Sequence, residues 1–393
     1  MTKKTKEGMP INSMILKWAR EQSGYSIEDE VKKWPKFPLW EAGEGFPTYS
    51  QLEEIAKRYK RPIALFFFPS APHEQSIEKS LRAIKEDDVI HLSPLLRKLF
   101  RRGKAFQLSL KELNADEENL QIQRISWLNS LKQSRIEGIA KEARAVLGVD
   151  LNEQKSWQSS DQALKQWRKI LANNGIYVFK EAFKDNKVSG FCIYDDLYPI
   201  IFLNNSMEFN RQIFTLFHEL AHIIFKESYL DVFDEYFWQL EYSQADHIEV
   251  KCNAFASEFL VPNEDILQRI GNSSSQNLDD FYALAETYKV SKEVILRKLL
   301  SVNTIDRKRF SEEVKKLQKA YQNFAIEKKK NKKPGGSSHN NQISYLGDAF
   351  LKLVIAKYSQ GKISIEEASE HLNLKTKSFL EIEDRFVSRG GFA

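Results

Sequence analysis

Cysteine is scarce in this chain, and a long apolar run is missing. The 393 residues include 2 cysteines, Cys192 and Cys252, so the sequence implies no disulfide framework. No apolar stretch approaches the roughly 20 residues that a membrane-spanning helix needs, and the N-terminal MTKKTKE has no apolar signal region. These absences argue against a disulfide-rich secreted protein and a membrane-spanning one, and they predict a cytoplasmic protein.

The overall composition is that of an ordinary soluble protein. Apolar residues make up 42% and charged residues 29%, which argues against a disordered chain. The formal net charge of +5 points to no particular partner. A length of 393 residues predicts two or three domains with ample chain for a catalytic core.

Histidine is also scarce, yet two of the 7 histidines stand four residues apart in the motif HELAH, His218 to His222. On a helix this spacing places both imidazoles on one face, where they can bind one Zn²⁺. Glu219, directly after the first histidine, can then act as a general base on water. The alternative is a helix with two histidines satisfied by other partners. With so few histidines, the motif arises by chance in about one such sequence in a hundred.

The surroundings of the motif favour the metal. Residues 211–225 form a strongly apolar and therefore buried helix, in which a metal would satisfy both imidazoles at once. Before it, β-branched and aromatic residues predict strands at 175–179, 190–194 and 198–203, the last ended by Asn204-Asn205. A small sheet beside such a helix commonly holds an extended peptide by strand addition.

A third metal ligand is expected further along the chain. Residues 223–228 lack the glycine and histidine that a metzincin needs, so that class is excluded. Residues 248–262 read as a second helix, stopped by a proline. Glu249 and Asn253 share one face of it. Glu249 can complete a His₂Glu site with an open fourth position, and Asn253 can hydrogen-bond the outer nitrogen of a ligating histidine.

Two rivals to Glu249 remain open. His247 lies about 200° around the helix from Glu249, so both cannot reach one metal. Cys252 lies one turn from Glu249, although an unpaired cysteine usually serves as a small buried residue. An oxyanion-stabilising donor is also expected, and His247, Tyr236 and Tyr242 are its candidates. The tyrosines, with Trp238, belong to an acidic, aromatic stretch that either forms a lid or only packs.

Together these residues resemble the ImmA/IrrE family of zinc metallopeptidases. The resemblance lies in FTLF before HELAH, in the pattern E-x-x-C-N-x-F-A within 249–262, and less specifically in 175–205 and 288–299. The departures are Cys252, where the family usually has alanine, and the inserted stretch 228–244. The resemblance implies a protein substrate, typically a helix-turn-helix repressor whose cleavage derepresses genes after DNA damage or in a mobile-element or phage response.

Residues 10–70 resemble an XRE-type helix-turn-helix domain. Helices are predicted at 12–21, 26–33 and 50–59, and the resemblance includes the signature WEAG and the start PTYSQL of the last helix. The expected recognition helix departs from the pattern, because residues 33–38, KWPKFP, contain two prolines and no Arg, Gln or Asn to read base edges. Both DNA contact and a protein-interaction or substrate-recruiting role stay open.

The fold predicted for the whole chain is α+β and mostly helical. It combines an XRE-like helical domain, a zincin-like (gluzincin-type) catalytic domain with a small sheet, and a C-terminal helical unit. A basic helix at 96–104, with either a solvated or a phosphate-contacting face, and the Lys-, Gly- and Ser-rich linker 328–341 lie between them. The predicted parts are the XRE-like domain 1–75, a helical connector 76–160, the peptidase domain 161–305, a helix and linker 306–341, and the helical unit 342–393.

The leading hypothesis is a zinc-dependent endopeptidase with one Zn²⁺ held by His218, His222 and Glu249, and with Glu219 as the base. One competitor is a regulator or interaction protein with structural zinc, which would need a fourth protein ligand such as His247 or Cys252. Another is a toxin-antitoxin or phage-defence component whose peptidase is held latent by the N-terminal domain. The oligomeric state is left open.

Overall fold

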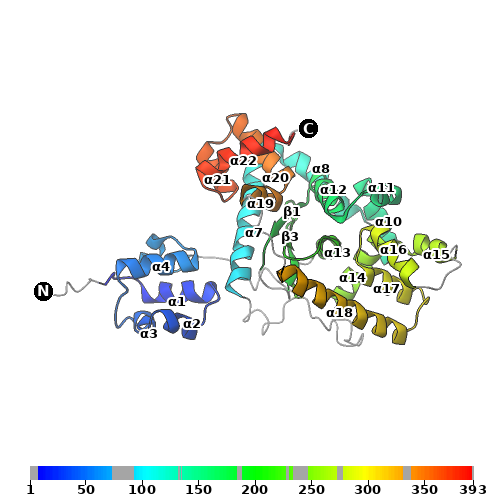
Figure 1. Cartoon of the computed structure of the whole chain (residues 1–393). Helices are drawn as coiled ribbons and strands as arrows, with labels where there is room; N and C mark the ends of the chain where they lie inside the picture. Colours follow the sequence, from blue (N-terminus) through cyan, green and yellow to red (C-terminus); the bar gives the residue numbers. More distant parts are fainter. Residues whose placement is uncertain are drawn as a thin grey trace. The chain divides into compact units, whose positions relative to one another are not determined.

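The chain folds into two compact units, residues 1–104 and 105–393 (Figure 1). Across the part of the chain that is described, no helix is both long enough and apolar enough to cross a membrane. The computed structural model describes residues 8–72, 93–131, 133, 135–183, 188–226, 230–232, 247–271, 278–330 and 338–391.

The first unit is a small bundle of short helices. Side chains cap several of them: Asn12 accepts a hydrogen bond from the Met14 amide, and Thr48 forms a capping box with Gln51. The helices close around a core that includes Leu16, Trp40 and Tyr59. Their order agrees with the helices predicted there, whereas the XRE assignment itself stays a prediction. The helices are α1 Ser13–Gln22, α2 Ile27–Lys33, α3 Phe37–Glu41, α4 Tyr49–Tyr59 and the 3₁₀ helix η1 Ile63–Phe67.

A short helix follows the proline-containing stretch that was expected to resist helix formation. α3 begins at Phe37 and carries Pro38 in its first turn, while Pro35 precedes it. A proline is tolerated in the first turn because its missing N–H would have no helical acceptor there. Residues 34–36 are outside any helix, as expected, whereas Lys33 ends α2 and the expectation is wrong for Phe37 and Pro38, which begin α3. α3 still offers no Arg, Gln or Asn.

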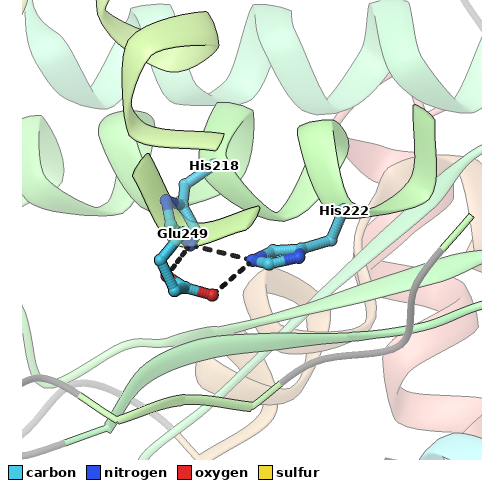
Figure 2. Close-up of side chains that lie close together, drawn as sticks. All are labelled: His218, His222 and Glu249. Carbon is cyan, nitrogen blue, oxygen red and sulfur yellow. Dashed lines mark hydrogen bonds and ion pairs between the residues drawn. The ribbon is translucent and has the colours of Figure 1, made fainter. Parts of the chain in front are cut away.

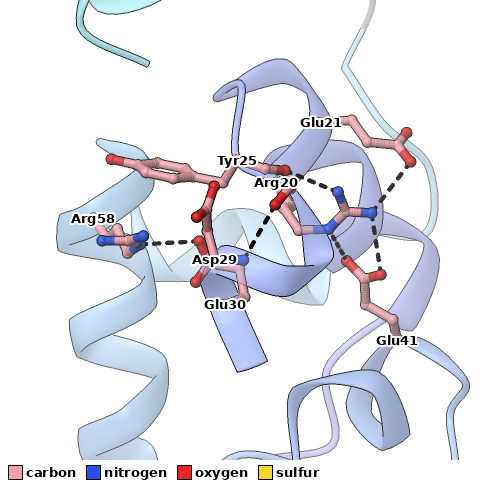
Figure 3. Close-up of polar contacts among 8 residues, drawn as sticks. Arg20, Glu21, Tyr25, Asp29, Glu30, Glu41 and Arg58 are labelled. Atoms are coloured by element: carbon pink, nitrogen blue, oxygen red, sulfur yellow. Dashed lines mark hydrogen bonds and ion pairs between the residues drawn. The ribbon is translucent and has the colours of Figure 1, made fainter. Parts of the chain in front are cut away.

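Partly buried ion pairs join the helices of the first unit (Figure 3). The Arg20 guanidinium bonds both carboxylate oxygens of Glu41, at 2.8 and 3.3 Å, and donates to the Tyr25 carbonyl. Arg58 donates to Glu30 at 3.0 Å while its guanidinium stacks over the Tyr25 ring. These contacts tie α1 to α3 and α2 to α4, so the polar groups fix the mutual arrangement of the helices.

The second unit surrounds a four-stranded sheet of order β1-β3-β2-β4. β1 pairs parallel with β3, and β2 pairs antiparallel with β3 on one side and with β4 on the other. The first three strands confirm the predicted ones, and β3 ends at Asn204 as expected. The fourth was not predicted and lies within the inserted stretch 228–244. The strands are β1 Tyr177–Glu181, β2 Val188–Ile193, β3 Ile200–Asn204 and β4 Leu230–Val232.

Helices cover both faces of this sheet, so β1, β2 and β3 are almost wholly buried (Figure 1). On one face, Val178, Cys192 and Ile201 join the core formed with helix α13. On the other, the Phe106 ring stacks on Phe179 at 4.5 Å. Burial on both sides explains why the strands read as continuous apolar runs rather than as alternating ones.

The other elements of the second unit are helices that precede or follow the strands β1 to β3 in the sequence. Before them come α7 Pro94–Leu113, which belongs to this unit from Ala105 on, η2 Ala115–Glu117, α8 Glu118–Ile125, α9 Trp127–Ser130, α10 Ile136–Leu147, α11 Leu151–Ser156 and α12 Ser160–Asn173. After them come α13 Phe209–Ile224, α14 His247–Leu260, α15 Asn263–Gly271, α16 Leu278–Tyr288, α17 Lys292–Ser301, α18 Arg307–Lys330, α19 Ser338–Leu346, α20 Asp348–Ser359, α21 Ile365–His371 and α22 Thr376–Ser388.

The C-terminal helices pack on the sheet rather than standing apart from it. The Phe350 ring of α20 lies 5.2 Å from that of Phe179 in β1. Arg168 of α12 donates to the carbonyls of Val178 and Ser344, which joins β1 to the end of α19. The predicted linker 328–341 is helical at both ends, in α18 and α19, and its middle lies outside the described residues.

Candidate metal centre

Helix α13 carries HELAH through the centre of the second unit. Its sequence is apolar on nearly every face, and its residues from Gln212 to Ile223 are buried with the exception of Phe214. One face packs on the sheet and another on α14, while the Trp167 ring of α12 meets Phe217 edge to face at 4.8 Å. His218, Glu219 and His222 are each at most 2% exposed. The helix therefore presents polar side chains inside a core, where they need polar partners.

Helix α14 brings the second part of the site. Its apolar residues Cys252, Phe255 and Phe259 are fully buried. Packing through these residues directs Glu249 and Asn253, one turn apart, to the histidines of α13. The two helices thus unite residues that stand about thirty positions apart in the chain.

The ligand-type atoms of His218, His222 and Glu249 converge on one point (Figure 2). The Nε2 atoms of the two histidines are 3.1 Å apart. The Glu249 carboxylate lies 3.2 Å from Nε2 of His218 through Oε2, and 3.1 Å from Nε2 of His222 through Oε1. All three side chains are buried.

This arrangement fits a tetrahedral zinc ion. Zinc bonds of about 2.0–2.1 Å at a tetrahedral angle separate neighbouring ligand atoms by about 3.3 Å. The separations of 3.1–3.2 Å between the three side chains match that value. Two imidazoles and one carboxylate are also the donor set of catalytic zinc sites that keep a fourth position open. The residues present therefore fit the metal.

Asn253 makes the contact expected of it. Its Oδ1 lies 3.0 Å from Nδ1 of His218, on the side of the ring away from Glu249. When Nδ1–H donates to this oxygen, the lone pair of Nε2 faces the cluster, which is the tautomer that a metal requires.

The electrostatics of the cluster keep Glu249 ionised. Burial by itself raises the pKa of the Glu249 carboxyl, but the neighbouring His218 and His222 outweigh it, so the pKa lies well below its usual range. The ionised carboxylate is the form that ligates a metal.

Glu219 lies on the sheet side of α13. Its carboxylate is fully buried, and its Cγ lies 3.5 Å from the point where a side chain on Gly190 of β2 would begin. Glu219 thus lies against β2 and next to the ligand-type His218 in the chain.

Most of the remaining predicted residues lie outside the described part of the structure. His247 is the first residue of α14, and its side chain lies outside the described residues, as do Tyr236, Trp238 and Tyr242. Cys252 is fully buried in the core shared by α13 and α14, in agreement with its interpretation as a packing residue. The third position of the described cluster is occupied by Glu249.

Two residues that support the site were missed. Arg144 of α10 donates to the carbonyl of Phe259, and Gln154 of α11 donates to that of Leu260 at 3.1 Å. These carbonyls belong to the last turn of α14, so both side chains hold the helix that bears Glu249. No local sequence signal marks them, because they lie more than a hundred residues before their partners.

Comparison with known proteins supports the same reading. Residues 172–300 match the family model Peptidase M78, described as an IrrE N-terminal-like domain. The match covers the sheet, α13 and α14. No curated protein matches the chain.

Proposed function

Since residues 172–300 belong to the Peptidase M78 family, we propose that this protein is a zinc-dependent endopeptidase. The observation that carries the proposal is the convergence of His218, His222 and Glu249, with Glu219 adjacent on the same buried helix. A structural zinc would need a fourth protein ligand, and the cluster found among the described residues has three. Of the two candidates for that ligand, Cys252 does not belong to the cluster.

The proposed role of each residue follows from the position of its side chain. His218, His222 and Glu249 would hold the metal, and Asn253 would keep His218 in the ligating tautomer. Zinc in such a site supplies a Lewis acid that polarises a peptide carbonyl and activates water at neutral pH.

Glu219 moves the proton in this proposal. Its carboxylate accepts a proton from the attacking water and then delivers it to the nitrogen of the departing amine. Its burial keeps bulk water from competing for that proton.

The proposed substrate is a regulatory protein, in particular a helix-turn-helix repressor, cut in the cytoplasm during a stress, mobile-element or phage response. The support is the resemblance of residues 211–225 and 249–262 to ImmA/IrrE peptidases. The first unit, a small helical bundle with its own core, is the proposed recruiting element.

The experiment compares wild type with Glu219→Gln, using as substrate a repressor encoded beside this gene. The variant should bind zinc as wild type does and lose cleavage, because the amide cannot accept the proton. Glu264→Gln, at an exposed glutamate of α15, is the matched control and should cut normally. Cleavage by Glu219→Gln would refute the mechanism. A zinc-loaded wild type that cuts nothing would favour the non-catalytic regulator instead.

A further inference from the structure

Gly190 of β2 lies where the sheet comes closest to the helix that bears the proposed base. A Cβ atom added to Gly190 would lie 2.6 Å from Cγ2 of Thr215 and 2.9 Å from the carbonyl oxygen of Phe202. Both distances are shorter than real Cβ contacts. Gly190 does not have a positive φ, so its backbone conformation suits alanine as well. The only obstacle to alanine is therefore the steric clash of its Cβ.

The contact reaches Glu219 through α13. Thr215 and Glu219 stand four residues apart, so they lie one above the other on the helix face that meets β2. We propose that Gly190 is a positioning residue, whose missing side chain sets how deeply α13 seats on the sheet and so where the Glu219 carboxylate lies. This inference rests on the proposed function only for the effect on cleavage. The seating itself can be measured without any activity.

The metal ligands are held by a different contact. His218 and His222 meet Glu249 and Asn253 of α14 within 3.2 Å, and these contacts join α13 to α14 without a residue of the sheet. A change at Gly190 should therefore move α13 and α14 together relative to the sheet. The cluster would keep its geometry, while Glu219 would shift relative to a peptide aligned along the sheet.

The first test is Gly190→Ala. The new Cβ would lie 2.6 Å from Thr215 Cγ2, which is 0.8 Å less than the 3.4 Å at which ordinary contact begins. We therefore expect α13 to move away from the sheet by several tenths of an ångström near Thr215. A crystal structure of the metal-free full chain would show this displacement of Glu219 relative to β3. A misplacement approaching 1 Å should lower kcat on the order of 10–100-fold. Zinc affinity, measured by chelator competition, should stay at the wild-type value.

The second test removes the obstacle. In the Gly190→Ala background, Thr215→Ser deletes the methyl that clashes and keeps the hydroxyl, so it should return α13 toward its original depth and recover part of kcat. Recovery should be incomplete because the Phe202 carbonyl still opposes the new side chain. Gly271→Ala is the matched control, since a Cβ there meets nothing within 4 Å.

The outcomes separate the two proposals. An undisplaced Glu219 in Gly190→Ala, or a kcat that falls without any rescue by Thr215→Ser, overturns the positioning role. Loss of zinc binding in parallel with kcat also overturns it, because the effect would then be general damage. If wild type cuts no substrate, the endopeptidase proposal fails, and the structures of Gly190→Ala and of the double variant still decide whether Gly190 seats α13.

Discussion

The contact between Asn253 and His218 predicts a measurable contribution to metal affinity. The perturbation is Asn253→Ala, which removes the acceptor 3.0 Å from Nδ1 of His218 and leaves the three ligands in place. His218 is 2% exposed, so water has poor access to replace the missing acceptor. The imidazole could then rotate and place its proton on Nε2, the atom that faces the metal.

The expected size follows from the role of this hydrogen bond. Removing a partner of a ligating histidine typically lowers metal affinity by about 10–100-fold, which corresponds to about 1.4–2.7 kcal/mol. The effect should stand toward the upper end, because the hydrogen bond is largely buried. Asn253→Asp should weaken zinc binding much less, since a carboxylate still accepts from Nδ1.

The assay is competition for zinc between the protein and a chromophoric chelator of known affinity. Lys251→Ala, at an exposed residue of the same helix, controls for changes in α14 and should bind zinc like wild type. If Asn253→Ala binds zinc as tightly as wild type does, the tautomer argument is wrong, and Asn253 is only a packing residue.

Two predictions concern stability. Lys298→Met should lower the free energy of unfolding, measured in urea, by about 3–5 kcal/mol, because it leaves the largely buried Glu258 carboxylate without its ammonium partner. Adding Glu258→Leu should restore most of that stability, and a double variant no better than the single one would contradict the explanation. Burial raises the pKa of Asp265, but hydrogen bonds from Lys155, Tyr288 and Arg269 outweigh it, so the pKa lies below 3.8. The ionised carboxylate therefore stabilises the fold above that value, and its contribution fades as pH falls below about 5. Asp265→Asn should flatten this acid-side decline in stability, and an unchanged slope would contradict the assignment.

The sequence predicted the site better than it predicted its surroundings. HELAH, Glu249 and Asn253 could be found because helical spacing puts residues four apart on one face, and the structure brings these faces together. The strands before the motif could be found because β-branched and aromatic residues fill buried strands. Helical spacing and strand composition are local features of the sequence, so they can be recognised without knowing the tertiary structure.

What the sequence could not show depends on contacts between distant segments. β4 was not foreseen because its three residues are too few to show a strand pattern, and pairing with β2 decides their conformation. From the sequence, Gly190 could only be interpreted as the first residue of a strand. Its proposed role depends on the close approach of Thr215 in α13, which the sequence does not show. A glycine inside a strand can signal such an approach, although it does not say what approaches.

Because the sheet is buried on both faces, the segment that matches the family model depends on helices outside it for its stability. The family match begins at residue 172, after most of α12, and ends at residue 300, before α20. A fragment with those limits would lack Trp167 on one side of the core and both Phe106 and Phe350 on the other. Exposed faces of that kind favour aggregation. A stable fragment that contains the Peptidase M78 segment therefore has to include these helical neighbours or substitutes for them.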